Sequence, residues 1–356
     1  MIKVLIVDDS ALIRQLLKTM LESDPDIEVV GVASDPFMAR EKIKKLNPDV
    51  LTLDVEMPRM DGITFLINLM RLRPMPVVMV STLTEKGAEV TLRALEYGAI
   101  DFVSKPKLDV VEQLPGYSEE IITKVKTAAQ ANVKPLERNA SLQQNVSVHE
   151  KYSSDVIIPK VTGKHFKTTE KIIGIGSSTG GTEAIKDVVS LLPPNMPGIV
   201  ITQHIPETFS RAFSERVNTI TKLNVMEATD GQQILPGHVY IAPGNRHLLI
   251  RRDGARYICR LNDGQPVNRH KPSVDVMFRS LAQNVGPNAI GVMLTGMGSD
   301  GADGMGEMKQ EGASTIAQDE NSSVVWGMPG EAVKRGHVDE VIPLNKIGKR
   351  LIELCS

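Results

Sequence analysis

Short apolar runs alternate with longer amphipathic segments through the first 125 residues of the chain. The runs consist largely of Val, Ile and Leu, which is typical of strands buried in a parallel sheet. The segments between them have helical spacing; in one of them Leu12, Leu16 and Met20 fall on one face. Strands that alternate with helices predict a doubly wound parallel α/β sheet. The expected strands are 4–7, 28–33, 50–53, 77–80 and 102–104, and the expected helices are 11–22, 36–46, 63–72 and 88–97.

A second α/β pattern begins at Ile172, after a stretch that has no hydrophobic period. In this stretch, 126–165, polar residues and Val are scattered, which indicates a polar linker with a helix running into its start. We therefore expect two α/β domains, 1–125 and 166–356, the second with a mostly parallel sheet and a hairpin turn at Asp253-Gly254. Its expected strands are 172–175, 198–202, 239–242, 248–251, 257–260, 290–295, 314–317 and 338–342, and its expected helices are 182–192 and 273–283.

The composition narrows the class of protein. The 356 residues include 41 Lys and Arg against 43 Asp and Glu, and 41% are hydrophobic, so the chain can fold and has no excess positive charge to attract nucleic acid. Two cysteines give neither a disulfide framework nor a cysteine-rich metal site. The N-terminus lacks the features of a signal peptide, and no run of about 18 apolar residues occurs. We expect a cytoplasmic protein without membrane insertion or a nucleic-acid partner.

Acidic residues gather where strands of the first domain end. Asp8 and Asp9 follow the first expected strand, and Asp54 follows the third. The carboxyl ends of parallel strands form the ligand crevice of a doubly wound sheet, so these carboxylates should meet there and attract a hard cation such as Mg²⁺. Ser81 and Lys105 end two further strands at the same edge, where a hydroxyl and an ammonium suit phosphoryl oxygens.

This pattern resembles the motifs of the response-regulator receiver family. The matching segments are Val7-Asp8-Asp9-Ser10, Asp54-Val55-Glu56-Met57-Pro58, Asp61-Gly62, Ser81-Thr82 and Lys105-Pro106. The resemblance implies that Asp54 accepts a phosphoryl group from a histidine kinase. The implied Mg²⁺ site consists of Asp9, Asp54 and the carbonyl oxygen of Glu56, with support from Asp8. The implied phosphoryl switch consists of Ser81, Lys105 and the aromatic Phe102.

A glycine-rich turn in the second domain, 176–181, follows an expected strand and opens an expected helix. It fits a loose dinucleotide-binding fingerprint, and it also fits a nucleophile turn of the G-x-S-x-G form that presents Ser178 at the sheet edge. A nicotinamide site expects an acidic residue at the end of the next strand, but that strand ends at His204. Because histidine can deprotonate a serine, the sequence favours the nucleophile turn over the nucleotide loop.

A serine–histidine pair needs a carboxylate to fix the imidazole tautomer. Asp300 lies in a glycine-rich loop, 296–301, just past the expected strand 290–295, so it should reach the same edge. Neither His238, which precedes a strand, nor His270 and His337, which lie in polar surroundings, is expected to be the base. The chain order serine, histidine, aspartate differs from the order in the α/β-hydrolase fold, so we expect a different topology.

The second domain resembles the CheB-type methylesterase family. The matching segments are 176–181, Gln203-His204-Ile205-Pro206, Ala242-Pro243-Gly244, 271–278, 294–301 and Ala317-Gln318-Asp319-Glu320. The resemblance implies hydrolysis of glutamyl methyl esters on methyl-accepting chemotaxis receptors, deamidation of receptor glutamines, a chemotaxis histidine kinase as phosphodonor, and no cofactor in this domain. The implied roles are Ser178 as nucleophile, His204 as general base and acid, Asp300 as its orienting group and the backbone N–H of Met297 as oxyanion donor.

Several alternatives stay open. Thr179 is a weaker candidate for a second oxyanion donor, and Arg246 and His247 are weak candidates for the substrate groove, since a surface position is the favoured interpretation for both. The second half could instead bind DNA, although 166–356 has no basic recognition helix. It could also be a catalytically silent receptor-binding adaptor, which methanol release from methylated receptor membranes would exclude. For an esterase, we expect the unphosphorylated receiver to cover the Ser178 site.

Overall fold

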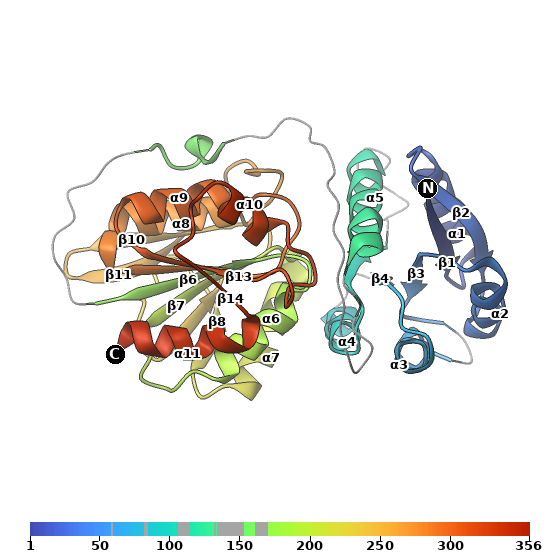
Figure 1. The fold of residues 1–356 in the computed structure, drawn as a ribbon, viewed down its shortest axis with the longest axis horizontal. Coiled ribbons are helices and arrows are strands. Elements are labelled where there is room, and N and C mark those ends of the chain that lie inside the picture. Colours follow the sequence, from blue (N-terminus) through green and yellow to red (C-terminus); the bar gives the residue numbers. More distant parts are fainter. Residues whose placement is uncertain (58–59, 82–84, 106–113, 132, 134–152, 161–169) are drawn as a thin grey trace. The chain divides into compact units, whose positions relative to one another are not determined.

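The chain forms two compact units, 1–145 and 146–356. The computed structural model describes all residues except 58–59, 82–84, 106–113, 132, 134–152 and 161–169 (Figure 1). Within the described residues, every helix is too short or too polar to cross a membrane.

Strands and helices alternate in the first unit, as the apolar pattern predicts. The strands are β1 (Ile2–Val7), β2 (Ile27–Ala33), β3 (Val50–Asp54), β4 (Val77–Ser81) and β5 (Asp101–Ser104). The helices are α1 (Ala11–Glu22), α2 (Pro36–Leu46), α3 (Gly62–Leu72), α4 (Glu85–Glu96) and α5 (Leu114–Gln130). The strands form one parallel sheet in the order β2-β1-β3-β4-β5. α1 packs against α5 and α3 against α4, which explains why β3 and β4 are buried throughout.

The second unit is larger and also α/β (Figure 1). Its strands are β6 (Ile172–Ser177), β7 (Gly198–Gln203), β8 (Asn224–Glu227), β9 (His238–Ile241), β10 (His247–Asp253), β11 (Arg256–Asn262), β12 (Ala289–Met293), β13 (Ser314–Gln318) and β14 (Glu340–Ile342). Its helices are α6 (Gly181–Ser190), α7 (Glu207–Ile220), α8 (Val274–Asn284), α9 (Ala302–Gln310), α10 (Met328–Lys334) and α11 (Leu344–Cys355). A parallel sheet in the order β14-β13-β12-β6-β7-β9-β8 confirms the predicted class, and β10 and β11 form a separate antiparallel hairpin.

The strand order reverses beside β6. The chain passes from β6 to β7 on one side, whereas it passes from β12 to β13 on the other. Connections that leave neighbouring strands in opposite directions open a crevice at the carboxyl ends of those strands. The segments that follow β6, β7 and β12 carry Ser178, His204 and Asp300. The sheet topology therefore directs these three residues to one edge.

Glycines in β6 allow α8 to lie close against the sheet. A Cβ atom on Gly174 would lie 2.3 Å from Cδ1 of Leu281, and one on Gly176 would lie 2.2 Å from Cγ1 of Val274. Both contacts are far shorter than van der Waals distance, so the depth of α8 depends on the missing side chains. Because Val274 begins α8, this packing also sets the position of the helix N-terminus.

The predicted linker, 126–165, is described only in part. α5 continues through its start to Gln130, beyond the predicted domain end at 125. Farther along, Ser153–Lys160 lies on the second unit. Arg279 of α8 donates hydrogen bonds to Oδ1 of Asp155 at 2.6 Å and to the carbonyl oxygen of Ile158 at 3.0 Å. This part of the predicted linker is therefore attached to α8.

Replacing Gly174 by alanine should destabilise the second unit by about 1–3 kcal/mol, because the added methyl group overlaps Leu281 in a filled core. The single tryptophan, Trp326, lies in this unit, so urea unfolding followed by its fluorescence measures the change. Gly116→Ala on α5 is the control, because a Cβ atom there would meet no atom within 4 Å. A Gly174→Ala variant as stable as the wild type would contradict the packing described for α8.

Candidate active site

Ser178 is the first residue after β6, in the turn that leads into α6. Its backbone N–H donates to the carbonyl oxygen of Thr295 at 3.1 Å, and its own carbonyl accepts from the N–H of Gly181 at 2.7 Å and from Nε2 of Gln203 at 2.9 Å. The turn passes through Gly180 at a φ of +75°, which glycine adopts without strain. The backbone of Ser178 is thus held by three hydrogen bonds while its side chain stays half-buried at the sheet edge.

His204 follows β7, the neighbour of β6, and its imidazole pairs with Asp300. Nε2 of His204 lies 2.8 Å from Oδ2 of Asp300, and the His204 side chain is only 9% exposed. A carboxylate accepts hydrogen bonds, so Nε2 carries the hydrogen and Nδ1 is the basic nitrogen. Nδ1 is buried and has no hydrogen-bond partner in the described part of the chain. His204 therefore has the protonation pattern of a general base.

Asp300 is buried, and both of its carboxylate oxygens accept hydrogen bonds. Oδ1 accepts from Oγ of Ser273 at 2.8 Å and from Nδ2 of Asn268 at 2.9 Å, while Oδ2 accepts from the N–H of Val274 at 2.7 Å. That N–H belongs to the first turn of α8, where the helix dipole favours a negative charge. Burial acts to raise the pKa of Asp300, but the hydrogen bond and charge of His204 outweigh it and hold the pKa below its ordinary value. Asp300 is therefore ionised when it orients His204.

A second buried carboxyl group, Asp275, lies beside Asp300. Nδ2 of Asn268 bridges the two acids, 2.5 Å from Oδ2 of Asp275 and 2.9 Å from Oδ1 of Asp300. Burial, together with the charge of Asp300, raises the pKa of Asp275 to about 8. At neutral pH the negative charge of this pair therefore resides mainly on Asp300.

Two histidines that the sequence did not favour contribute to the site. His270 stacks on His204, with ring centroids 3.7 Å apart and ring planes 11° apart. His247, for which a surface position was favoured, is fully buried: its Nδ1 accepts from the N–H of Ser273 at 3.2 Å, and its Nε2–H donates to the carbonyl oxygen of Gln265 at 2.9 Å. Burial lowers the pKa of His247, so this neutral ring supports the start of α8. Its exposure was mispredicted because its burial depends on the packing of α8 against β10.

The other polar candidates lie in ordinary structural contacts. Arg246 is half-buried, and its Nε forms an ion pair with Oδ1 of Asp263 at 2.6 Å. His238 and His337 each have Nδ1 hydrogen bonded to a backbone carbonyl group, at 2.9 Å and 2.8 Å. Ser178 and His204 follow the neighbouring strands β6 and β7, but Nδ1 of His204 accepts no hydrogen bond from Ser178 or from any other described residue, so their catalytic pairing stays a prediction.

The glycine-rich loop after β12 lies directly against Ser178. A Cβ atom on Gly296 would lie 2.9 Å from Cβ of Ser178, so a larger residue at 296 would displace the serine. The carbonyl oxygen of Gly296 accepts from the N–H of Gly327 at 3.1 Å, which holds the loop. Met297, the predicted oxyanion donor, is the next residue of this loop, and Thr179, the weaker candidate, is buried beside Ser178 in the turn.

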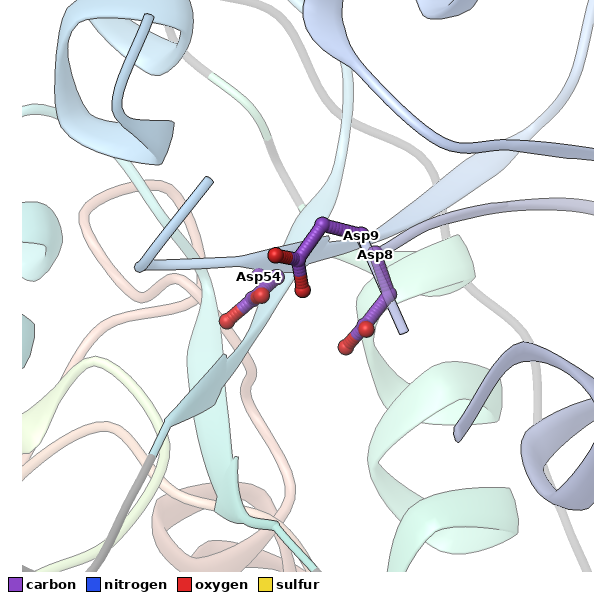
Figure 2. Close-up of side chains that lie close together, drawn as sticks. All are labelled: Asp8, Asp9 and Asp54. Atoms are coloured by element: carbon purple, nitrogen blue, oxygen red, sulfur yellow. The ribbon is translucent and has the colours of Figure 1, made fainter. Parts of the chain in front are cut away.

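The first unit carries a cluster of acidic side chains at the carboxyl ends of β1 and β3, shown in Figure 2. Asp8, Asp9 and Asp54 each offer a carboxylate oxygen, and these atoms lie within 4.8 Å of one another. Nζ of Lys105 lies 2.8 Å from Oδ2 of Asp54 and 3.3 Å from Oδ2 of Asp8. Burial raises the pKa of Asp54 to about 6 despite Lys105, and burial also raises the pKa of Asp8. One lysine thus leaves the carboxylates incompletely neutralised.

The residues of this pocket fit a hard divalent cation. Oδ2 of Asp8 is buried and accepts no hydrogen bond from any described residue, although Lys105 lies nearby. Clustered carboxylate oxygens are the protein ligands that Mg²⁺ prefers. The N–H of Glu56 donates to Oδ1 of Asp54 at 3.2 Å, so the backbone predicted to complete the metal site lies beside the pocket while its side chain is exposed.

The two remaining switch candidates lie in the neighbouring strands β4 and β5. Ser81 ends β4 and is buried, and its hydroxyl lies 3.5 Å from the carbonyl oxygen of Gly87. Phe102 in β5 is also buried, and Nζ of Lys124 lies 5.0 Å from its ring centroid. Both side chains therefore occupy the interior of the first unit, with Phe102 turned towards α5.

Comparisons with known proteins cover both units. The CheB methylesterase family matches residues 173–351, and the response regulator receiver domain matches residues 4–113. A protein-glutamate methylesterase/protein-glutamine glutaminase of Hydrogenovibrio crunogenus is 58% identical over 372 residues, which cover 100% of this chain and 99% of the relative. One from Xanthomonas campestris pv. campestris is 58% identical over 357 residues, with 100% and 98% covered.

A solved structure supports the assignment of the second unit. The crystal structure of the Thermotoga maritima CheB methylesterase catalytic domain is 39% identical, with a TM-score of 0.51, and the match covers 52% of this chain and 98% of that domain. The observed parallel sheets agree with both matched domains. The chain therefore belongs to the CheB methylesterase family, with a response-regulator receiver domain ahead of its methylesterase domain.

Proposed function

We propose that this chain is a phosphorylation-activated protein-glutamate methylesterase. It hydrolyses glutamyl methyl esters on methyl-accepting chemotaxis receptors in the cytoplasm, and it also deamidates receptor glutamines. The observation that carries the proposal is the 2.8 Å pair of His204 and the buried, ionised Asp300 at the crevice that also holds Ser178. A DNA-binding or adaptor domain would gain nothing from a charged residue kept in its interior, because burial of a charge costs stability.

The first half of the reaction forms an acyl-enzyme. Oγ of Ser178 attacks the ester carbonyl carbon while its proton passes to Nδ1 of His204. Asp300 stabilises the imidazolium through Nε2–H, and the N–H of Met297 donates to the oxyanion. The tetrahedral intermediate collapses when the bond to the methoxy oxygen breaks, and His204 returns the proton to that oxygen. The products of this half are methanol and a glutamyl ester of Ser178.

The second half restores the serine. A water molecule gives a proton to His204 and attacks the acyl carbon, and the protonated His204 then protonates the departing Ser178 oxygen. The released side chain is a glutamate. A glutamine follows the same route, except that ammonia leaves instead of methanol, because both substrates pass through a tetrahedral acyl intermediate.

The receiver domain supplies the control. Asp54 accepts the phosphoryl group from a chemotaxis histidine kinase. Mg²⁺, held by Asp9, Asp54 and the carbonyl oxygen of Glu56 with support from Asp8, would offset the negative charge of that group when bound. Nζ of Lys105 contacts the phosphoryl oxygens in this proposal, which its 2.8 Å distance from Oδ2 of Asp54 supports. The Ser81 hydroxyl and the Phe102 ring follow this change and transmit it. The proposed segments are those predicted from the sequence: a receiver domain at 1–125, a linker at 126–165 and a catalytic domain at 166–356.

Ser178→Ala should reduce methanol release from methylated receptor membranes by about 10³-fold or more, because the variant lacks the hydroxyl on which the proposed acyl-enzyme forms. Phosphorylation of Asp54 by a small phosphodonor should be unchanged in this variant. Ser190→Ala, at the exposed end of α6, is the matched control and should release methanol at the wild-type rate. If Ser178→Ala retained the wild-type rate, another residue would have to be the nucleophile.

Mg²⁺ should stabilise the receiver unit more at about pH 7.5 than at about pH 5. The pKa of Asp54, about 6, lies above its ordinary value of 3.8, so the stability linked to this group is fully present below pH 3.8 and is lost as the pH rises through 6. A cation offsets that loss only when the carboxylate is charged. Calorimetry with and without MgCl₂ measures the shift in melting temperature.

Asp54→Asn should show a smaller Mg²⁺ shift, whereas Asp61→Asn should show the wild-type shift. Asp61 caps α3 and lies outside the acidic cluster, so this substitution removes a carboxylate without touching the proposed metal site. Equal Mg²⁺ shifts at the two pH values would contradict the assignment of the pocket.

Removal of residues 1–152 should raise basal methanol release on the order of tenfold. This factor assumes that Ser178 is accessible in about 10% of the unphosphorylated full-length molecules. The expected increase follows from the proposal that the unphosphorylated receiver restricts access to Ser178. A start at 153 keeps Asp155 and its hydrogen bond to Arg279, which a start near 166 removes. Activity equal to or below that of the unphosphorylated full chain would refute the restriction.

A further inference from the structure

His270 is presented to His204 by a tight turn, 267–270. The N–H of Val267 donates to the carbonyl oxygen of His270 at 3.0 Å, and the N–H of His270 donates back at 2.8 Å. The two central residues, Asn268 and Arg269, have φ values of +50° and +69°, the signature of a type I′ turn. Asn tolerates this region, but an arginine is strained in it. Strained turns of this kind persist where the surroundings determine the backbone strongly, and they cluster at functional sites.

Asn268 joins this turn to the catalytic acid. Its Nδ2 donates to Oδ1 of Asp300 at 2.9 Å and to Oδ2 of Asp275 at 2.5 Å. The amide that completes the hydrogen bonding of Asp300 thus also fixes the place of His270, two residues later. The His270 ring consequently covers one face of His204 at 3.7 Å, while Asp300 holds the edge of the same imidazole.

We propose that His270 is a positioning residue of the hydrolytic site: its neutral ring keeps the His204 imidazole aligned with Asp300, and its protonation suppresses the base. The inference rests on the proposed role of His204 as the base. When His204 takes the proton of Ser178 it becomes a cation, and a neutral ring on its face tolerates that charge. A protonated His270 would place a second positive charge at 3.7 Å, which opposes proton transfer.

The charged groups around the stacked pair support this assignment. Asp300 favours a cation on either ring, and Asp275 is held near it through Asn268. On the chain, Arg269 and Lys271 flank His270, and Nζ of Lys271 is directed to the carbonyl oxygen of Asp263 at 3.4 Å. The imidazole of His204 is hydrogen bonded to Asp300, and the charge of His270 also acts on that carboxylate. Because the two rings are stacked 3.7 Å apart, a positive charge on one ring opposes protonation of the other.

Two substitutions separate the effect of the ring from the effect of its charge. His270→Phe keeps a planar ring that cannot be protonated, and His270→Ala removes the ring. Methanol release from methylated receptor membranes by the full chain is measured between about pH 5 and pH 8, across the usual range of histidine titration. At about pH 8 we expect His270→Ala to lower kcat about tenfold or more with KM within about twofold, and His270→Phe to stay within about threefold of the wild type.

As the pH falls, the ratio of kcat/KM for His270→Phe to that of the wild type should rise by up to about tenfold per pH unit, because only the wild type loses activity to protonation at 270. The receiver titrates equally in both proteins, so its contribution cancels from the ratio. His238→Phe is the matched control and should give a ratio that is independent of pH. His238 is the first residue of β9, whereas the proposed site lies at the carboxyl ends of the strands, and its Nδ1 is hydrogen bonded to a backbone carbonyl group. Fluorescence of Trp326 at each pH verifies that the compared proteins are folded.

A ratio for His270→Phe that does not change with pH overturns the proposal, and so does an alanine variant with the wild-type kcat. If His270→Ala does not fold, His270→Phe carries the test alone. His204→Ala in the same assay distinguishes this failure from failure of the proposed function. Wild-type activity of His204→Ala would mean that His204 is not the base. An inactive His204→Ala variant together with a flat ratio would overturn only the role of His270.

Discussion

An ionised carboxylate can remain inside a protein only when its oxygens are fully hydrogen bonded, and the second unit is organised around meeting this condition for Asp300. The start of α8 provides the N–H of Val274, and the strained turn provides the amide of Asn268. His204 closes the set from the end of β7. The position of α8, the geometry of the turn 267–270 and the tautomer of His204 all depend on the buried charge of Asp300. A change in any of them would therefore alter the alignment of the proposed base, His204.

The receiver pocket handles its carboxylates in the opposite way. Asp54 is buried with a raised pKa, and one oxygen of Asp8 has no hydrogen bond from the described residues. Lys105 contacts both acids but cannot neutralise three of them. One lysine does not neutralise these acids, so we expect a bound cation to stabilise the cluster, whereas the carboxylate of Asp300 receives its hydrogen bonds from the chain itself. The two units therefore differ in what stabilises their buried carboxylates: an added cation in the first unit, and hydrogen bonds from the chain in the second.

Residues at the ends of parallel strands were predictable, because chain order alone determines which edge they share. Asp54, Lys105 and His204 were all placed by that rule, and the structure brings each to the expected edge. His270 could not be placed in this way. It lies outside the periodic segments, and its turn contains Asn-Arg rather than the glycine that signals a type I′ turn. The burial of His247 was equally hidden, since it depends on how α8 packs rather than on local pattern.

The attachment of Asp155 to Arg279 has a mechanical consequence. The chain that leads out of the receiver is anchored on α8, about one and a half turns from Val274, whose N–H holds the carboxylate of Asp300. A helix is stiff along its axis, so a force applied at Arg279 would act on α8 as a whole. Tension in the segment that precedes Asp155 would therefore act on the helix whose N-terminus holds Asp300, the partner of the proposed general base.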